Sequence, residues 1–293
     1  MAALSPTMRG VIFMVIATIG WAAMMIFVRL LVDDYSTFEI LFVRNAVALI
    51  VLSPLLMRSG LGVLRTGRPW LHVLRATLSY LGMLGLYYGI SLIPLGDVVA
   101  LSFTQPLFIT VLAALILGEA VGMARWRATA IGFLGVLIIV RPGFAEISGA
   151  TIAVLVAALL YSASNICIKL LMRTDTPLQA VVYVNLIMLP LALVPALFAW
   201  NAPGWADFGL MIGVGLSGTL GVYMLTKSYQ AADASAVVPF DFLRLPMTAA
   251  GAFILFGEIV DLWTWIGAAV IFGSSYALVR FESRRDAVTS NNA

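Results

Sequence analysis

Charged residues are scarce in this sequence. Only 11% of its 293 residues are Asp, Glu, Lys or Arg, whereas 62% are hydrophobic; ordinary soluble domains carry about 25% charged residues. A transmembrane helix needs about 20 apolar residues, so ten of them would use about 200 and leave about 93 for loops and tails. That remainder excludes an appended soluble domain of useful size. The sequence therefore indicates a protein that lies almost entirely in the membrane.

Cysteine and histidine are nearly missing as well. Cys167 is the single cysteine, which excludes a disulfide framework and any cysteine-based metal site. His72 is the single histidine, which excludes histidine-rich metal chemistry. The sequence has no GxxxxGK[ST] loop that would bind a nucleotide. We therefore expect no metal, no cofactor and no catalytic residues.

The positive charges do not form a patch for nucleic acid. The 17 Lys and Arg residues exceed the 14 Asp and Glu residues, but they lie at the ends of apolar runs. A surface that binds nucleic acid requires such charges to cluster where water reaches them. The partners that we expect are a small-molecule substrate and the lipid bilayer, without nucleic acid, and we expect a monomer.

The apolar runs predict an all-α polytopic membrane protein. They are apolar on all sides and do not alternate as the strands of a membrane barrel do. A window of about 19 residues finds ten candidate helices. The ten predicted helices cover residues 10–32, 38–57, 71–92, 96–117, 126–140, 149–172, 178–200, 207–229, 235–256 and 263–281.

The Lys and Arg residues predict the orientation of these helices. When the ten helices are threaded through the membrane, thirteen of the 17 Lys and Arg residues lie at or near the side that holds both termini. Cytoplasmic loops carry the excess of Lys and Arg. We therefore predict an integral protein of the bacterial cytoplasmic (inner) membrane with both termini in the cytoplasm.

The two halves of the sequence repeat each other weakly. A shift of 140 residues places Trp21 opposite Tyr161, and a shift of 139 places Gly118-Glu119 opposite Gly257-Glu258. Five helices per half is an odd number, so the second half is inverted relative to the first. Inverted repeats are common in secondary transporters, where two pseudo-symmetric halves open a central site to each side in turn. A duplication without a mechanical role is the alternative.

These observations predict a domain organisation. The first five-helix repeat covers residues 10–143, and the second, inverted repeat covers residues 149–282. We expect a central cavity between the repeats. Residues 283–293 are expected to form a flexible cytoplasmic tail.

Two prolines near the middle of the fourth and ninth helices are hinge candidates. Pro106 and Pro246 each remove a backbone donor and free a carbonyl about four residues earlier. Interrupted helices at matching positions of two halves point to a transport site. A kink that only improves packing is the alternative.

Polar residues precede both prolines. The 139-residue shift places Ser102 opposite Asp241 and Gln105 opposite Arg244, and each half thus has an i,i+3 pair on one helix face. Charged residues inside the membrane are costly and are candidates for a functional site. Asp241 and Arg244 could bind the ammonium and carboxylate of a zwitterion, Asp241 could carry a proton, or the pair could only neutralise itself.

Three further charged residues are candidates for a gate or a structural contact. Arg44 lies about six residues into the second helix, roughly 9 Å deep at 1.5 Å per residue, where it could pair with an acid on the outer side. Glu119 and Glu258 each follow a glycine at a helix end. That pattern is typical of a C-terminal turn whose acid reaches a basic residue or a helix N-terminus.

Several mid-helix aromatic residues and one amide are expected to line the cavity, although packing is the alternative for each. Trp21 and Tyr161 are related by the repeat, which favours a position near the central axis. These cavity-lining candidates are Trp21, Tyr80, Tyr87, Phe103, Tyr161 and Asn165.

The sequence resembles the EamA-domain group of the drug/metabolite transporter superfamily. The resemblance rests on Trp21 to Leu31, on Phe42-Val43-Arg44-Asn45, and on a mid-helix proline followed about a dozen residues later by Gly-Glu in each half. It covers residues 10 to 281 and implies a ten-helix carrier of small metabolites that works by alternating access. Length and aromatic content make the chain most similar to the YddG-type exporters of aromatic and neutral amino acids.

The expected function is therefore secondary transport of small amphipathic metabolites, with export of neutral or aromatic amino acids as the main hypothesis. Uptake of a vitamin or cofactor by the same fold is the alternative. An intramembrane lipid-modifying enzyme would need a nucleophile–base pair or metal ligands at membrane depth. The sequence offers Cys167 beside Lys169 but no second group of ligands to accompany them. A receptor subunit that binds without flux is the other class considered.

Overall fold

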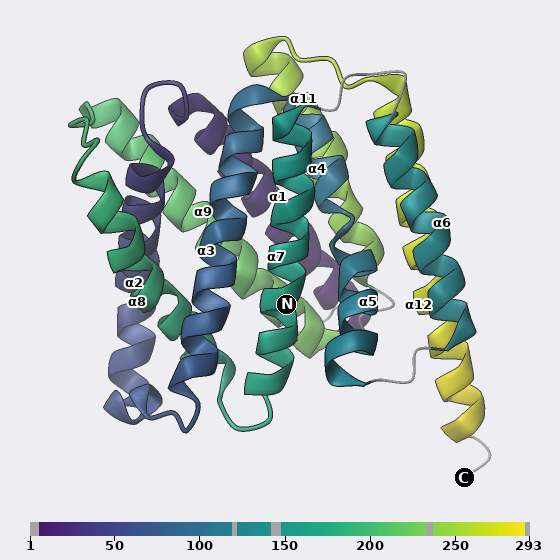
Figure 1. Cartoon of the computed structure of the whole chain (residues 1–293). Coiled ribbons are helices and arrows are strands. Elements are labelled where there is room, and N and C mark those ends of the chain that lie inside the picture. Colours follow the sequence, from purple (N-terminus) through teal and green to yellow (C-terminus); the bar gives the residue numbers. More distant parts are fainter. Residues whose placement is uncertain (1–5, 119–121, 142–147, 233–236, 291–293) are drawn as a thin grey trace. The chain divides into compact units, whose positions relative to one another are not determined.

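The computed structural model describes residues 6–118, 122–141, 148–232 and 237–290, and the secondary structure in these ranges is helical (Figure 1). The first half contains α1 (Pro6–Leu31), α2 (Thr37–Ser59), the 3-10 helix η1 (Leu61–Leu64), α3 (Pro69–Leu92), α4 (Leu95–Ser102), α5 (Gln105–Leu117) and α6 (Met123–Val140). The second half contains α7 (Gly149–Leu171), α8 (Pro177–Ala196), α9 (Trp205–Ala231), the 3-10 helix η2 (Val238–Leu243), α11 (Arg244–Phe256) and α12 (Leu262–Ser290).

The ten predicted helices are present in the described residues, with α4 and α5 forming one segment and η2 and α11 another. Six helices are long and apolar enough to cross a membrane, namely α1, α2, the α4–α5 segment, α7, α8 and residues Trp205–Leu225 of α9. The apolar part of α6, Trp126–Val140, is shorter. Helix α12 continues to Ser290, through most of the segment that we expected to be a flexible tail.

The fourth and ninth segments are interrupted close to their prolines. Helix α4 ends at Ser102, Phe103 and Thr104 form a turn, and α5 begins at Gln105 with Pro106 in its first turn. In the second half, residues Val238–Leu243 are wound as a 3-10 helix before α11 begins. A proline is tolerated in the first turn of a helix, where the amide that it lacks would have no partner. Each break therefore falls just before its proline.

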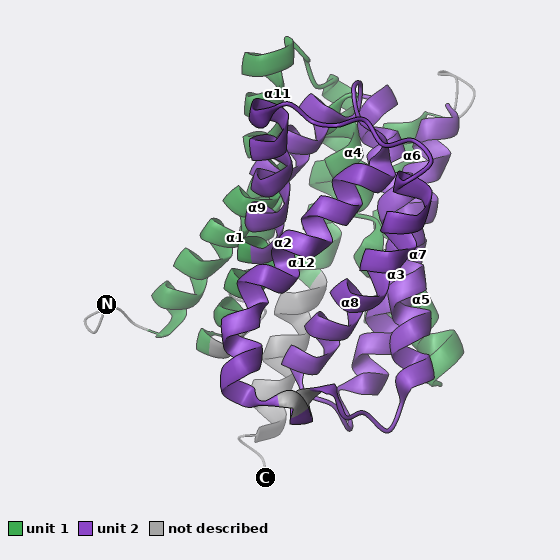
Figure 2. Cartoon of the chain, turned by 90° about the vertical axis from the view of Figure 1, so that its left-hand side faces the viewer, with its two compact units in different colours: residues 1–22, 94–147, 220–293 green, residues 23–93, 148–219 purple. Residues whose placement is uncertain are grey.

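The chain forms two compact units, and each unit contains parts of both sequence halves (Figure 2). Unit 1 comprises residues 1–22, 94–147 and 220–293. Unit 2 comprises residues 23–93 and 148–219. Helices α1 and α9 each contribute one portion to each unit.

Glycine sets the helix spacing in unit 1. Helices α6 and α12 pack along each other, and a Cβ atom on Gly135 would lie 2.7 Å from the carbonyl oxygen of Gly267. The reverse also holds, because a Cβ atom on Gly267 would lie 2.5 Å from the carbonyl oxygen of Gly135. The two backbones are thus in direct contact, as small residues permit between membrane helices.

Glycine has the same role between α3 and α7 in unit 2. A Cβ atom on Gly85 would lie 2.9 Å from the carbonyl oxygen of Ala153, and one on Gly89 would lie 2.2 Å from a methyl carbon of Val154. Helices α3 and α7 are therefore in close contact.

The turn between α1 and α2 is bound to the region between α8 and α9 in unit 2. Ser36 and Glu39 form a capping box at the start of α2, and Glu39 also accepts a hydrogen bond from the backbone amide of Asn201. Nearby, the Tyr35 hydroxyl donates to a carboxylate oxygen of Asp207 at 2.8 Å. We call these contacts the Glu39 network.

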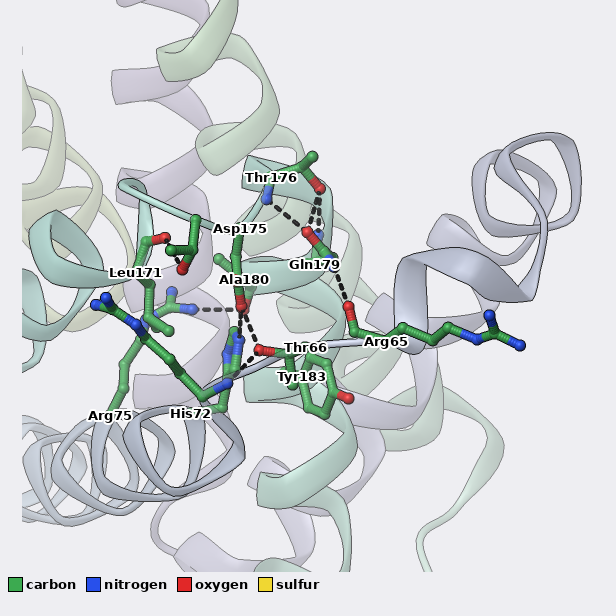
Figure 3. Close-up of polar contacts among 12 residues, drawn as sticks. Arg65, Thr66, His72, Arg75, Leu171, Asp175, Thr176, Gln179, Ala180 and Tyr183 are labelled. Carbon is green, nitrogen blue, oxygen red and sulfur yellow. Dashed lines mark hydrogen bonds and ion pairs between the residues drawn. The ribbon is translucent and has the colours of Figure 1, made fainter.

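A related set of contacts binds the turn between α7 and α8, and Figure 3 shows it. Thr176 and Gln179 form a capping box at the start of α8, and the Gln179 side-chain amide donates to the carbonyl oxygen of Arg65 at 2.9 Å. Asp175 accepts from the Thr66 hydroxyl at 2.6 Å, and the same carboxylate oxygen lies 2.7 Å from Nε2 of His72. We call these contacts the Gln179 network.

Tyr183 covers the histidine of the Gln179 network. Its ring stacks on the His72 ring with centroids 4.3 Å apart (Figure 3). The Tyr183 hydroxyl also donates to the carbonyl oxygen of Leu64 at 2.6 Å. The His72 side chain has no solvent exposure, and that of Asp175 has 3%. No role for His72 could be predicted from the sequence, because the residue that faces it lies more than 100 positions away.

The two networks are related by the internal repeat. Ser36 and Glu39 match Thr176 and Gln179 at the 140-residue shift, and in each case the second residue of the box also binds the backbone of a loop from the other half. The start of α2 is thereby joined to the end of α8, and the start of α8 to the region after α2. Helices α2 and α8 of unit 2 are therefore antiparallel, as Figure 1 also shows.

The Gln179 network should make stability depend on pH. Burial alone would raise the pKa of Asp175, but hydrogen bonds from Thr66 and His72 outweigh it and hold the pKa below its ordinary value near 3.8. A carboxylate whose pKa is lower in the folded state stabilises the fold above the ordinary pKa, and this stabilisation is lost as the pH falls through the folded-state pKa. Asp175→Asn should therefore lower the melting temperature in detergent at pH 7, with a smaller difference at pH 3.

An exposed carboxylate provides the control for this prediction. Asp33 lies in the α1–α2 turn and is exposed, so Asp33→Asn should change the melting temperature little at either pH. An equal loss in Asp175→Asn at pH 7 and pH 3 would contradict the proposed contribution of the ionised form.

Candidate functional site

A cavity of about 240 Å³ lies within unit 1, between the two interrupted segments. Six of the site candidates predicted from the sequence line it, together with residues from α5, α6 and α12. Its lining residues are Ser102, Phe103, Gln105, Pro106, Leu107, Ile109, Thr110, Ala128, Thr129, Asp241, Phe242, Arg244, Ser274 and Ser275. The structure thus brings both predicted polar pairs to one place.

The break between α4 and α5 positions the first pair. The Ser102 hydroxyl donates to the carbonyl oxygen of Val98, one turn earlier at 2.7 Å, so it is satisfied within α4. Thr104 follows in the turn, and its fully buried hydroxyl has no hydrogen-bond partner in the described residues. Gln105 and Pro106 then open α5 beside the cavity. Thr104 was not among the residues predicted from the sequence.

Asp241 and Arg244 face each other at the start of α11. A guanidinium nitrogen of Arg244 lies 3.6 Å from a carboxylate oxygen of Asp241, with 16% and 28% of the two side chains exposed. The other carboxylate oxygen of Asp241 and Nε of Arg244 are buried without a hydrogen-bond partner in the described residues. Buried polar atoms are nearly always paired. The ion pair therefore keeps hydrogen-bonding capacity for another group.

Two aromatic rings face the Arg244 guanidinium. Its central carbon lies 5.5 Å from the ring centroid of Trp21 and 5.1 Å from that of Phe103. Both distances are within the range of cation–π attraction. Trp21 belongs to the part of α1 that lies in unit 1.

Further aromatic rings continue from Phe103 to α12. The ring of Phe242 lies 4.3 Å from that of Phe103 and 4.3 Å from that of Phe272, and Tyr276 lies 5.8 Å beyond Phe272. Such distances are typical of stacked and tilted aromatic pairs. The i,i+4 spacing of Phe272 and Tyr276 is the sequence signal that could have indicated them. Of these rings, those of Phe103 and Phe242 line the cavity, and together with the ion pair they suit a flat ring system that carries polar atoms.

The remaining aromatic candidates and Asn165 belong to unit 2 and are not lining residues of this cavity. The buried Tyr80 hydroxyl donates to the carbonyl oxygen of Leu191 at 2.9 Å, which is a packing contact with α8. The Tyr161 ring contacts α3 at Gly82. Tyr87 is fully buried, and its hydroxyl has no hydrogen-bond partner in the described residues. Asn165 is exposed.

Arg44 also lies in unit 2, and its expected pairing with an acid is not found among the described residues. Its Nη1 contacts the sulfur atom of Met83 at 3.4 Å, and its Nε is buried without a partner. A thioether is a weak acceptor. The positive charge is therefore not compensated within the described structure.

The Gly-Glu candidates are only partly described. Gly118 and Gly257 both end their helices in the left-handed conformation, with φ of 63° and 68°. Glu258 accepts a hydrogen bond from the Leu95 amide at the start of α4, at 2.8 Å. This contact agrees with an acid that reaches a helix N-terminus, and a gating role stays a prediction. Glu119 lies outside the described residues.

The hinge candidates differ in their surroundings. Pro106 lines the cavity, whereas Pro246 is exposed in the first turn of α11 and is not a lining residue.

No group of three or more His, Cys, Asp or Glu side chains that could hold a metal occurs in the described part of the chain.

The profile of the EamA-like transporter family matches the chain twice, over residues 8–141 and 148–280. The chain belongs to this family of membrane proteins. It is a secondary transporter of a small molecule and not an enzyme.

The chain is also similar to individual proteins of known name. The chain is 35% identical over 280 residues to a riboflavin transporter of Rhizobium johnstonii, covering 94% of this chain and 93% of the relative. It is 29% identical over 248 residues to an S-adenosylmethionine uptake transporter of Rickettsia prowazekii, covering 85% and 84%. A solved crystal structure matches with a TM-score of 0.62 at 17% identity, over 92% of this chain and 98% of that chain, which supports the fold alone.

These relatives correct part of the sequence interpretation. The EamA assignment is confirmed. Similarity to the YddG-type exporters, and with it the export of amino acids, is not supported, because the relatives named above transport riboflavin or take up S-adenosylmethionine. The resemblance to those exporters rested on length and aromatic content, which do not identify a substrate.

Proposed function

We propose that this protein is an uptake carrier for a vitamin or cofactor with a flat heteroaromatic ring, and that riboflavin is its first candidate substrate. The observation that carries the proposal is the 35% identity to a riboflavin transporter over 94% of the chain. A second riboflavin transporter, from Vibrio cholerae, is also 35% identical, over 83% of this chain and 83% of the relative. S-adenosylmethionine is the second candidate.

The chemistry of the cavity in unit 1 supports a ligand of this kind. Riboflavin and S-adenosylmethionine both contain a flat, nitrogen-rich ring system. The lining residues Phe103 and Phe242 offer aromatic rings for stacking, and Asp241 and Arg244 offer an acceptor and a donor for polar ring atoms. Ligand sites combine mostly apolar walls with a few such polar groups.

The size of the cavity indicates how much of the substrate it holds. Sites for drug-sized ligands have volumes of roughly 300–1,000 Å³, whereas this cavity has about 240 Å³. It can therefore receive a ring system, and a complete cofactor would require it to widen. The broken segments α4–α5 and η2–α11 border the cavity and provide the places where backbone angles can change.

We further propose that the two halves are inverted repeats that alternate access to the substrate. The antiparallel arrangement of α2 and α8 and the matching Glu39 and Gln179 networks support inversion. The distribution of Lys and Arg supports cytoplasmic termini, and the bacterial origin of the relatives supports a place in the cytoplasmic membrane.

Uptake by purified protein in liposomes tests the proposal. Riboflavin flux should be saturable and should exceed that of protein-free liposomes at least about tenfold, as expected of a carrier with a defined binding site. Radiolabelled S-adenosylmethionine and tryptophan, each with and without a proton gradient, serve as comparisons. Flux of S-adenosylmethionine alone would replace the first candidate with the second, and flux of tryptophan alone would overturn the proposal.

A further inference from the structure

A fully buried hydroxyl and an uncompensated cation lie together in unit 2. Arg44 is on α2, seven residues after the first residue of that helix, and its only hydrogen-bond acceptor in the described residues is the sulfur atom of Met83. Tyr87 on α3 is 0% exposed, and its hydroxyl has no partner in the described residues. Met83, whose sulfur atom contacts Arg44, precedes Tyr87 by four residues on α3, so the two side chains are neighbours on the helix face that Arg44 approaches.

Helix α9 packs directly against the Arg44 guanidinium. Gly218 of α9 faces Arg44, and a Cβ atom there would lie 3.5 Å from Nε and 3.6 Å from Nη2. The lack of a side chain at Gly218 lets α9 pass directly beside the guanidinium. The partly buried arginine therefore presents donors that no described carboxylate occupies.

Burial of these groups without partners is unfavourable in the absence of a ligand. An arginine side chain is permanently charged and presents five N–H donors, and a buried hydroxyl without a hydrogen bond loses the bonds that it made to water. Removal of either group should therefore stabilise the empty protein or leave its stability unchanged. Residues that reduce stability in this way are found at functional sites.

We infer that Arg44 and Tyr87 form a binding site for an oxygen acceptor of the transported molecule. Both residues belong to unit 2, neither is a lining residue of the described cavity in unit 1, and the inference rests on the proposed uptake function. Two acceptors share the required chemistry: the carboxylate of S-adenosylmethionine and the ring carbonyls of riboflavin. A guanidinium with a neighbouring phenol can donate several hydrogen bonds to either one.

The test combines ligand-free stability with substrate affinity. Arg44→Gln and Tyr87→Phe should melt in detergent at the wild-type temperature or above it, and both should raise the apparent KM for uptake, by about tenfold for Arg44→Gln, which is the loss expected for one charge-assisted hydrogen bond. Tyr183→Phe is the matched control, because the Tyr183 hydroxyl is satisfied by Leu64. It should lower the melting temperature and leave the apparent KM unchanged.

The nature of the acceptor follows from the choice of probe. Loss of S-adenosylmethionine binding in Arg44→Gln, together with weak binding of decarboxylated S-adenosylmethionine to the wild type, identifies a carboxylate. A riboflavin KM that depends on Arg44 identifies the ring carbonyls. Variants that melt at lower temperature but keep wild-type affinity would overturn the inference, as would variants that match the wild type in both measurements.

Failure of the proposed function can be separated from failure of this inference. If the wild type carries neither riboflavin nor S-adenosylmethionine, sodium acetate at matched ionic strength replaces them as a carboxylate probe. Acetate should then raise the melting temperature of the wild type and not that of Arg44→Gln. An equal response of both proteins would overturn the inference.

Discussion

Arg244→Gln is expected to lower substrate uptake at least about tenfold. The substitution removes the donor that faces both aromatic rings and leaves the partly buried Asp241 carboxylate without its partner. A partly buried carboxylate left without its partner is unfavourable, and a loss of about 1.4 kcal/mol is a factor of about ten in affinity. Initial uptake rates in liposomes, normalised to reconstituted protein, measure the effect.

The double variant Asp241→Asn/Arg244→Gln separates binding from structure. It removes both charges, so no charge is left unpaired and the melting temperature should recover toward that of the wild type. If the pair binds substrate, uptake stays low in the folded double variant. Recovery of uptake together with stability would show that the pair only neutralises itself. Uptake that loses its dependence on a pH gradient in Asp241→Asn alone would instead assign a transported proton to Asp241.

Gly267→Ala is expected to destabilise the protein more than the addition of one methyl group suggests. The added Cβ atom would lie 2.5 Å from the Gly135 carbonyl oxygen, which belongs to the backbone and cannot move without shifting α6. Overpacking costs about 1–3 kcal/mol, and each kcal/mol lowers the melting temperature by roughly 2–4 °C in larger domains. A decrease of about 2–12 °C in detergent is expected, with reduced yield of monodisperse protein.

The same substitution elsewhere on α12 should have the opposite effect. A Cβ atom added to Gly273 would have no neighbouring heavy atom within 4 Å, so alanine fits there. Because alanine favours the helix over glycine by roughly 0.5–1 kcal/mol, Gly273→Ala should raise the melting temperature slightly or leave it unchanged. Equal decreases in both variants would mean that the contact between α6 and α12 is not the cause.

Much of the fold could be predicted from the sequence because each helix is specified locally. Runs of apolar residues define the helices, and prolines and glycines mark their breaks and ends, as at Pro106 and Gly257. The compact units could not be predicted in this way. They depend on which helices pack together across the two halves, for example α3 with α7, and that choice lies in surfaces that a count of apolar residues does not distinguish.

The candidate site, like the fold, could be predicted from the sequence only in part. The repeat aligned Ser102 and Gln105 with Asp241 and Arg244, and the structure places all four around one cavity. The repeat did not indicate which aromatic residues accompany them, since Tyr80 and Tyr161 belong to unit 2 and Phe272 was not predicted. A mid-helix aromatic residue has the same sequence signature whether it packs against another helix or contacts the substrate. The difference depends on the direction in which its side chain leaves the helix axis.

The mixed origin of the compact units has a consequence for the evolution of the chain. Unit 1 needs α4 to α6 from the first half and α11 to α12 from the second, and unit 2 likewise needs α2 and α3 together with α7 and α8. A fragment holding one half would contain neither unit complete. If the two halves arose by duplication of one gene, a single-repeat ancestor would have had to pair with a second copy, and the matching Glu39 and Gln179 networks would then have been one contact made twice between identical subunits.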